Sequence, residues 1–253
     1  MLKFLGTGSA FNKDMGNTSA YIKDGETLLL IDCGETVFAR IRETNLLDDV
    51  KKVYIVITHN HSDHIGSLGS LVDYCYLIKG ITPNFVLTND DSAEAQENSI
   101  KAYLKSVGVD EEKFEFSYGD MMEDVLPELK KIELVQVKHS KVLTSYAVEL
   151  YFADKTIYYT GDQNDLSYIK KIAKKLNKND LVYTDCSLRD YAKRIHVTLA
   201  ELEEIFEEEK RNQVYCMHFE NYSTVTEAKQ AGFNVAVREL SKEEILKHIA
   251  NRK

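Results

Sequence analysis

The sequence predicts a layered α/β fold in which two β-sheets pack face to face and helices cover the outside. Short β-type runs and amphipathic stretches alternate along the 253 residues, and in each half the strands precede most of the helices. Only two prolines occur, and no Gly/Ser-rich or repeated stretch marks a linker. We therefore expect a single domain over residues 1–253, and the 43% hydrophobic content is enough to fill its core.

The first half of the chain should supply four strands and three helices. A tight turn at Asp24-Gly25 lies between two of the β-type runs and predicts a hairpin. The run Val53–Ile57 is apolar on both faces, which is typical of a buried strand whose carboxyl end leads into a functional loop. We expect strands at residues 2–5, 19–23, 27–31 and 53–57, and helices at residues 35–44, 66–79 and 91–107.

The second half should begin with residues 108–129, an acidic and poorly periodic segment that we interpret as a surface insertion. Two later helix starts have the capping-box pattern, Thr198 with Glu201 and Ser241 with Glu244, in which the cap hydroxyl and the acid satisfy free amides of the first turn. We expect strands at residues 132–137, 145–152, 156–160, 181–184 and 214–217, and helices at residues 166–176, 199–210 and 242–249.

Composition excludes several classes of protein. Lys plus Arg number 32 and Asp plus Glu 41, and the net charge of 32 − 41 = −9 disfavours a protein that must neutralise many phosphates. No apolar run approaches the roughly 20 residues of a membrane span, and the N-terminus lacks a signal-peptide pattern. The four cysteines are far apart and form no C-x-x-C pair. We expect a cytoplasmic protein with reduced thiols, no membrane association and no stable nucleic-acid complex.

The densest chemical signal follows the buried strand at residues 53–57. Three imidazoles and one carboxylate fall within six residues, at His59, His61, Asp63 and His64. Imidazole nitrogens are good ligands for zinc and similar divalent ions, and a carboxylate completes the charge and can bridge two metals. The alternative is a polar loop whose histidines bond to the backbone, but histidines are rarely this dense without a ligand. The cluster therefore predicts a metal site.

Three more candidate ligands each follow directly after a predicted strand: His139, Asp162 and His218. Taken singly, each has an ordinary structural explanation, since Gly-Asp is common turn chemistry and a lone histidine is usually structural. Together with the first cluster they bring the number of ligands to seven. That is enough for two metals that share Asp162 and clamp a water between them.

These motifs resemble the metallo-β-lactamase fold, whose pattern Thr-His-x-His-x-Asp-His, a later His, a Gly-Asp and a final His matches residues 1 to about 221 in order. The resemblance implies an αββα sandwich and two divalent metal ions, most often zinc, with manganese or iron in some branches. It implies that His59, His61 and His139 hold one metal. Asp63, His64 and His218 would hold the other, with Asp162 as the bridge.

The order of further motifs is similar to that of ribonuclease Z-like phosphodiesterases. Phe4-Leu5-Gly6-Thr7-Gly8-Ser9-Ala10 opens the chain, and Asp185 is followed by His196-Val197-Thr198. In that group a histidine before the late helix protonates the leaving oxygen and an acidic residue orients it. The resemblance therefore implies that His196 is a catalytic acid and Asp185 its partner, because a carboxylate raises the basicity of imidazole and fixes its tautomer.

Two features of the sequence indicate which class of substrate the protein favours. The long, basic exosite arm with which bacterial ribonuclease Z grips tRNA has no counterpart in this sequence. The opening segment, through Gly16-Asn17-Thr18-Ser19-Ala20, looks closer to small phage and bacterial phosphodiesterases that degrade cyclic mononucleotides and so defeat Pycsar antiphage immunity. The implied activity is a metal-dependent phosphodiesterase that hydrolyses cyclic nucleotides to linear ones.

The implied mechanism is in-line attack by water activated between two metals, with Asp63 as base and His196 as acid. Aromatic side chains near the motifs are candidates for stacking on the base: Tyr146, Phe219 and Tyr222, and also Tyr74 and Tyr76. Members of this branch are commonly homodimers. The apolar residues Leu68, Leu71, Val72, Cys75 and Tyr76 are either a dimer face or ordinary core.

Two alternative enzyme functions stay open. A ribonuclease Z-like endonuclease would process RNA 3′ ends, and a thioesterase or lactonase would use the same metal scaffold. A β-lactamase is disfavoured because such enzymes normally have Cys where Asp162 stands. A non-catalytic binding protein fits poorly, because all seven ligands and the candidate acid are present.

Overall fold

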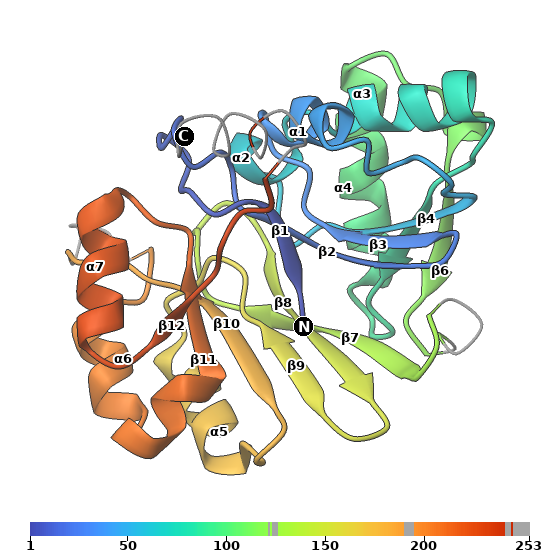
Figure 1. The fold of residues 1–253 in the computed structure, drawn as a ribbon. Coiled ribbons are helices and arrows are strands. Elements are labelled where there is room, and N and C mark those ends of the chain that lie inside the picture. Colours follow the sequence, from blue (N-terminus) through green and yellow to red (C-terminus); the bar gives the residue numbers. More distant parts are fainter. Residues whose placement is uncertain (121, 123–125, 190–194, 241–243, 245–253) are drawn as a thin grey trace.

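Two β-sheets lie face to face at the centre of the molecule, and helices cover the outer face of each (Figure 1). The computed structural model describes residues 1–120, 122, 126–189, 195–240 and 244. The observed architecture is the predicted αββα sandwich.

The first sheet runs in sequence order from one edge to the other. Its strands are β1 (Lys3–Gly6), β2 (Ser19–Asp24), β3 (Thr27–Ile31), β4 (Lys52–Val56), β5 (Asn84–Leu87) and β6 (Glu115–Tyr118). Strands β1 to β3 are antiparallel, and β3 to β6 are parallel. The predicted hairpin joins β2 to β3 through Gly25, whose positive φ of 53° is a conformation that glycine adopts readily.

The second sheet repeats this pattern in the second half of the chain. Its strands are β7 (Leu129–Val137), β8 (Ser145–Phe152), β9 (Thr156–Tyr159), β10 (Leu181–Asp185), β11 (Val214–Met217) and β12 (Asn234–Val235). Again the first three are antiparallel and the last four, counted from β9, are parallel. In both halves, therefore, the parallel strands present their carboxyl ends along one edge.

The helices divide between the two outer faces. The first half contributes α1 (Val37–Glu43), α2 (Ser62–Ile65), α3 (Leu68–Asp73), a π-helical turn (Tyr74–Lys79) and α4 (Ala93–Ser106). The second half contributes α5 (Leu166–Lys175), α6 (Leu199–Ile205) and α7 (Tyr222–Gln230). The predicted capping box at Thr198 is present, because its hydroxyl accepts the Glu201 amide while the Glu201 carboxylate accepts the Thr198 amide.

Strand alternation divides the core into three layers. In β3, Leu28 and Leu30 face the first-half helices, whereas Leu29 and Ile31 face the second sheet. The middle cluster lies between the sheets and joins β3 side chains to those of β8 and β9. The third cluster packs the second sheet against α5 to α7. Each sheet is thus buried on both faces, which explains its nearly continuous apolar runs.

The interpretation of residues 108–129 as a surface insertion is wrong. Residues 115–118 form β6, the edge strand of the first sheet, and Val109 and Phe114 are buried in the first-half core. A run of exposed acidic side chains separates these two buried residues, so the segment shows no clear helical period. Strands β5 and β12 and helix α7 also went unpredicted. The predicted helix at residues 199–210 ends at Ile205, and most of the helix predicted at residues 242–249, with its Ser241 cap, lies outside the described residues.

The apolar face considered as a dimer surface is core. Leu68, Leu71, Val72 and Cys75 are all buried between the first sheet and its helices, so they have no free surface for a second copy. Among the helices of the described residues, none combines the length and the apolar character that crossing a membrane requires.

Gly34 lies where two site-bearing loops touch. A Cβ at Gly34 would overlap the backbone carbonyl of Asp63, and it would also meet the Cβ of Asn17. Gly34→Ala should therefore push these loops apart and lower the free energy of unfolding by about 1–3 kcal/mol, measured by urea denaturation.

Gly69→Ala in α3 is the matched control. Its new methyl group meets mainly the half-exposed Val107 side chain, which can move, and alanine favours the helix. Equal destabilisation by both variants would contradict the proposed contact between the two loops.

Candidate metal centre

The candidate site lies at the carboxyl ends of strands from both sheets, where loops of an α/β fold usually carry chemistry. Asp32 follows β3, the His59 motif follows β4, and His139 follows β7. In the second sheet, Asp162 follows β9, Asp185 ends β10, and His218 follows β11. The topology thus brings together all seven predicted ligands. Asp63 and His218, which are in contact, are 155 residues apart in the sequence.

The first group of ligands consists of three imidazoles, His59, His61 and His139. The Nε2 atom of His59 lies 2.9 Å from Nδ1 of His61, and Nε2 of His139 lies 3.2 Å from the same atom. Burial lowers the pKa of all three rings, that of His139 to about 4. They are therefore neutral near neutral pH, which is the state that binds a metal.

The second group contains Asp63, His64, Asp162 and His218. His218 Nε2 lies 3.2 Å from a carboxylate oxygen of Asp63 and 3.2 Å from one of Asp162. His64 Nε2 lies 3.3 Å from the same two oxygens. Asp162 Oδ2 is also 4.0 Å from His139 Nε2, so this carboxylate lies between the two groups, where the predicted bridging ligand belongs.

The side chains of the second group fit a cation. His64 Nε2 and Asp162 Oδ1 are buried and have no hydrogen-bond partner in the part of the chain that is described. Burial lowers the pKa of His64, but the charges of Asp162 and Asp32 outweigh it, and the pKa ends well above its ordinary value. The surroundings therefore favour positive charge at this point. With histidine and carboxylate as donors, the seven residues suit two divalent metal ions.

Asp32 supports this group and was missed in the sequence. One oxygen accepts a hydrogen bond from His64 Nδ1 at 2.8 Å, so Nε2 of that ring is turned toward the centre. The other accepts the Thr58 amide at 2.8 Å. The Thr58 hydroxyl also donates to Asp32 and lies 3.1 Å from Nδ1 of His59. Asp32 thus orients one ring from each group. The signal for it was an acid directly after an apolar strand.

Two site residues have a backbone conformation that is rare outside glycine. Asp32 has φ 65° and His218 has φ 59°, both in the left-handed region. Such a conformation costs free energy and turns the side chain out of the direction of the preceding strand. It clusters at functional sites, and here it aims both side chains inward.

His196 and Asp185 form the contact that the resemblance implied. Nδ1 of His196 lies 2.9 Å from Oδ2 of the fully buried Asp185, which also accepts the Gln163 amide. Burial lowers the pKa of His196, but the hydrogen bond to Asp185 and the charges of Asp162 and Asp185 outweigh it and raise the pKa to about 9. His196 Nδ1 is 3.9 Å from Asp162, so a protonated imidazole lies beside the metal ligands.

The aromatic candidates lie in very different places. Tyr146 lines a cavity beside His59, and its hydroxyl is 3.1 Å from Ser92 Oγ. Tyr222 begins α7 and is 65% exposed. Phe219 is 1% exposed in the third apolar cluster, so the structure argues against a stacking role for it. Tyr74 packs on Phe38 with ring centroids 5.6 Å apart, away from the ligands.

Sequence comparison assigns the chain to a family. The family model described as "Anti-Pycsar protein Apyc1" matches residues 1–241. The chain belongs to the anti-Pycsar Apyc1 family. It is 28% identical over 234 residues to an Apyc1 protein of Bacillus phage 010DV004, covering 86% of this chain and 88% of that one. It is 31% identical over 172 residues to one of Paenibacillus sp. (strain J14), covering 64% and 66%.

Solved structures confirm the fold of this Apyc1-family chain. The metallo-β-lactamase fold protein YhfI of Bacillus subtilis superposes with a TM-score of 0.67 at 16% identity, covering 94% of this chain and 97% of YhfI. The short form of human tRNase Z superposes with a TM-score of 0.63 at 16% identity, covering 94% and 96%. The predicted metallo-β-lactamase fold is confirmed. Family, fold and the His/Asp cluster together support a metal-dependent hydrolase.

Metal binding should release protons unequally from the two groups. The imidazoles of the first group are already neutral, whereas His64 carries a proton that a metal must displace. Below the raised pKa of His64, the affinity of the second group should therefore rise roughly tenfold per pH unit, and that of the first should stay nearly constant. Zinc titrations by calorimetry in two buffers of different ionisation enthalpy measure this. Two binding events without proton release would contradict the assignment.

Asp32→Asn should weaken metal binding without touching a ligand. The amide cannot supply the charge that holds His64, so the affinity of the second group should fall about 10- to 100-fold in a chelator competition. Asp180→Asn is the matched control, because Asp180 is equally buried but accepts only the amides of Thr156 and Asn177. It should lower stability and leave metal affinity unchanged; a similar loss of affinity in both variants would contradict the role of Asp32.

Proposed function

We propose that this protein is a phosphodiesterase that hydrolyses cyclic mononucleotides to linear nucleotides with two divalent metal ions, zinc in the first place and manganese as the alternative. The single observation that carries the proposal is the imidazole of His196, held by Asp185 at 2.9 Å beside the seven candidate metal ligands. Membership of the anti-Pycsar family supports a role in evading cyclic-nucleotide antiphage immunity.

The candidate ligands, Asp63 and Asp185 would each have a different role in hydrolysis. The seven candidate ligands would hold two metal ions, which would lower the pKa of water and neutralise charge on phosphate oxygens. Burial raises the pKa of Asp63, but the hydrogen bond from His218 and the charge of His64 outweigh it and lower the pKa well below its ordinary value. Asp63 is therefore ionised, as a proton acceptor for the attacking water must be. Asp185 is too deeply buried to contact substrate and acts through His196.

His196 is suited to donate a proton to the leaving group. A ribose oxygen leaves poorly as an alkoxide, so its departure needs an acid. With a pKa of about 9, His196 is protonated near neutral pH, and its Nδ1 is occupied by Asp185. The proton for the substrate therefore comes from Nε2. The side chain is 17% exposed, so it is accessible although the carboxylate behind it is not.

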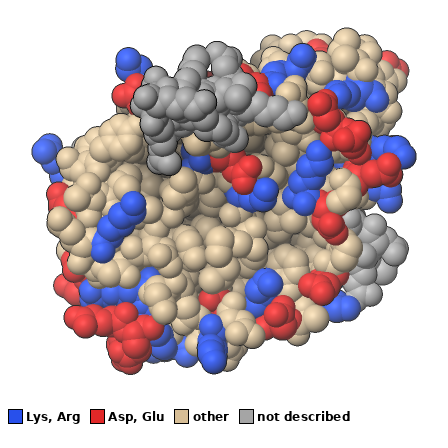
Figure 2. All heavy atoms as spheres, viewed as in Figure 1, with Lys and Arg blue, Asp and Glu red and all other residues tan. Residues whose placement is uncertain are grey.

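The distribution of charge favours a small substrate. On the face shown in Figure 2, Lys and Arg are scattered among Asp and Glu around a largely uncharged centre. A long polyanion would need a continuous basic stripe. A single cyclic nucleotide needs only the metal centre, because bound divalent ions are the largest local charges.

A panel of substrates tests the proposal. Zinc-loaded and manganese-loaded protein should open cyclic mononucleotides at rates far above a precursor tRNA, an acyl-glutathione or a lactone, as measured by chromatography of the products. Turnover of tRNA with no cyclic nucleotide hydrolysed would favour a ribonuclease Z-like endonuclease instead, and turnover of the thioester or lactone alone would favour an acyl hydrolase. Light scattering on the same sample tests the expected homodimer.

His196→Ala should slow hydrolysis of cyclic nucleotides about 10²- to 10⁴-fold, because the ribose oxygen then leaves without a proton. Hydrolysis of bis(p-nitrophenyl) phosphate, whose leaving group needs no proton, should change little. The ratio of the two rates in wild type and variant is the measurement. An equal loss on both substrates would remove His196 from the role of acid.

A further inference from the structure

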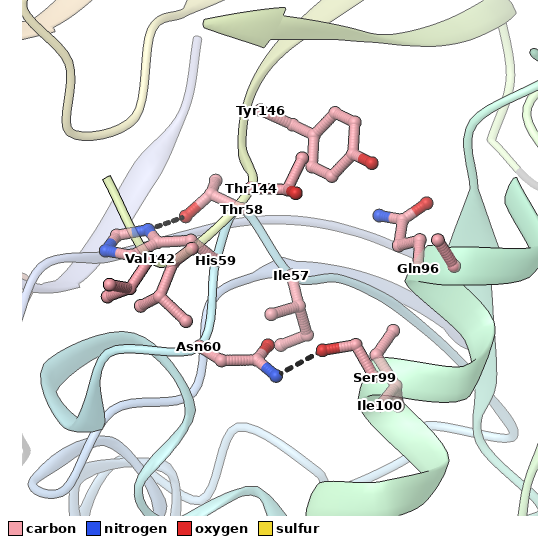
Figure 3. A pocket seen from close by; sticks show the side chains of 12 residues that line it. Ile57, Thr58, His59, Asn60, Gln96, Ser99, Ile100, Val142, Thr144 and Tyr146 are labelled. Carbon is pink, nitrogen blue, oxygen red and sulfur yellow. Dashed lines mark hydrogen bonds between the residues drawn. The ribbon is translucent and has the colours of Figure 1, made fainter. Parts of the chain in front are cut away.

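A second feature lies beside the metal centre and contains no metal ligand except His59. It is a cavity of about 200 Å³ between α4 and the loops after β4 and before β8, which we call the α4 pocket (Figure 3). Its walls come from residues 57–60, residues 142–144, Tyr146 and the first two turns of α4. It is smaller than the roughly 300–1,000 Å³ of sites for drug-sized ligands, so it suits a single small group.

The α4 pocket is lined by the same chain segments that carry the first group of candidate ligands. Residues 57–60 end directly before His61, and residues 142–144 begin three residues after His139. His59 lines the pocket, while its Nε2 lies 2.9 Å from His61 on the metal side. A substrate whose phosphate is bound at the metals therefore has this pocket next to it.

Gln96 is the unusual residue of the pocket. It is 6% exposed on α4, and its Oε1 accepts the backbone amide of Thr88 at 2.9 Å. The backbone amide of Thr88 can only donate, so Oε1 of Gln96 must face it and the NH₂ group of Gln96 must point the opposite way. Figure 3 shows the NH₂ group turned toward Thr144 and Tyr146. Nε2 is buried and has no hydrogen-bond partner among the described residues.

A buried donor without a partner costs free energy, so its retention calls for an acceptor from a ligand. The rest of the lining shows what kind of ligand. Among the residues that the structure describes, no Lys, Arg, Asp or Glu lines the pocket, so it does not suit a phosphate or an ammonium group. Ile57, Ile100 and Leu143 give it apolar walls, and the Tyr146 ring is held in place through Ser92. A neutral, mostly apolar group with an acceptor atom fits this environment.

We propose that the α4 pocket binds the nucleobase of the substrate and that Gln96 donates a hydrogen bond to a carbonyl oxygen or ring nitrogen of that base. The inference rests on the proposed function, which places the cyclic phosphate at the metal centre. It makes Gln96 a specificity-determining residue. A nucleobase is a planar, neutral ring with acceptors on its edge, and a ribose is the spacer between it and the phosphate.

Gln96→Glu is the most direct test. It keeps an oxygen for the Thr88 amide and replaces the NH₂ donor by a second oxygen. Gln96→Met removes both polar groups at a similar length. In both variants kcat/KM for the best cyclic nucleotide should fall about 10- to 100-fold, mainly through KM, because a hydrogen bond to the substrate is lost. Hydrolysis of an abasic ribose cyclic phosphate, which has no ring to place in the pocket, should stay within about twofold of wild type.

Gln136→Glu makes the same amide-to-carboxylate change outside the α4 pocket. Gln136 is exposed on β7 and lines a neighbouring, more open cavity of about 520 Å³ together with Lys138, His139 and Lys141. Because it lies outside the α4 pocket, the variant should leave both activities unchanged. The wild-type protein offers a test without any variant. An abasic ribose cyclic phosphate should be hydrolysed with a KM at least about tenfold higher than that of the best cyclic nucleotide.

Each outcome separates the inference from the proposed function. Loss of turnover of the abasic substrate together with nucleotide turnover would show that Gln96 is only structural. Unchanged kinetics in the Gln96 variants, or a selective loss in Gln136→Glu, would place the base elsewhere. In all these cases cyclic nucleotide hydrolysis by the wild type would stand. If the wild type hydrolyses no cyclic nucleotide at all, the proposed function itself fails.

Discussion

The concentration of buried carboxylates is the constraint on which the rest of the structure depends. Asp32, Asp63, Asp162 and Asp185 are all at most 5% exposed, and ionised carboxylates are costly to bury unless positive charge or hydrogen-bond donors face them. Imidazoles meet each of them, and the pKa of His64 and His196 rises in response. Metal ions are the stronger compensation, because two divalent ions bring about four positive charges. The fold therefore creates a site that favours the binding of cations.

The repeated sheet pattern makes that concentration possible. Each half has three antiparallel strands followed by parallel ones, and the parallel strands of both halves end at a common edge. The first half supplies His59, His61, Asp63 and His64 from the segment that leads from β4 into α2, and the second supplies His139, Asp162 and His218 from three loops. Neither half holds a complete set. The apolar layer between the sheets, rather than any ion pair, therefore keeps the two sets of ligands in register.

The clustering of the candidate ligands could be predicted from the sequence, because parallel strands end at one edge of a sheet and four of the candidates come within three residues of a strand end: His59, His139, Asp162 and His218. The burial of Phe219 could not be predicted from the sequence. Its neighbour His218 is a candidate ligand, and the phenyl ring turns inward because it packs with side chains of α5 to α7. Residues 108–129 misled for a related reason: edge strand β6 has one polar face, which hides its pairing with β5. Asp32 and Gln96 were missed because their roles depend on contacts that the sequence does not show. His64 is 32 positions away from Asp32, and Thr88 is eight positions away from Gln96.

The separation of α4 from the metal ligands has a consequence for the history of such proteins. The helix contributes Gln96 to the pocket and no atom to either ligand group. Substitutions on it can alter what the pocket accepts while the reacting centre keeps its geometry. Under the proposed function, selection on base preference could therefore act on one face of α4 while the candidate metal ligands stay unchanged.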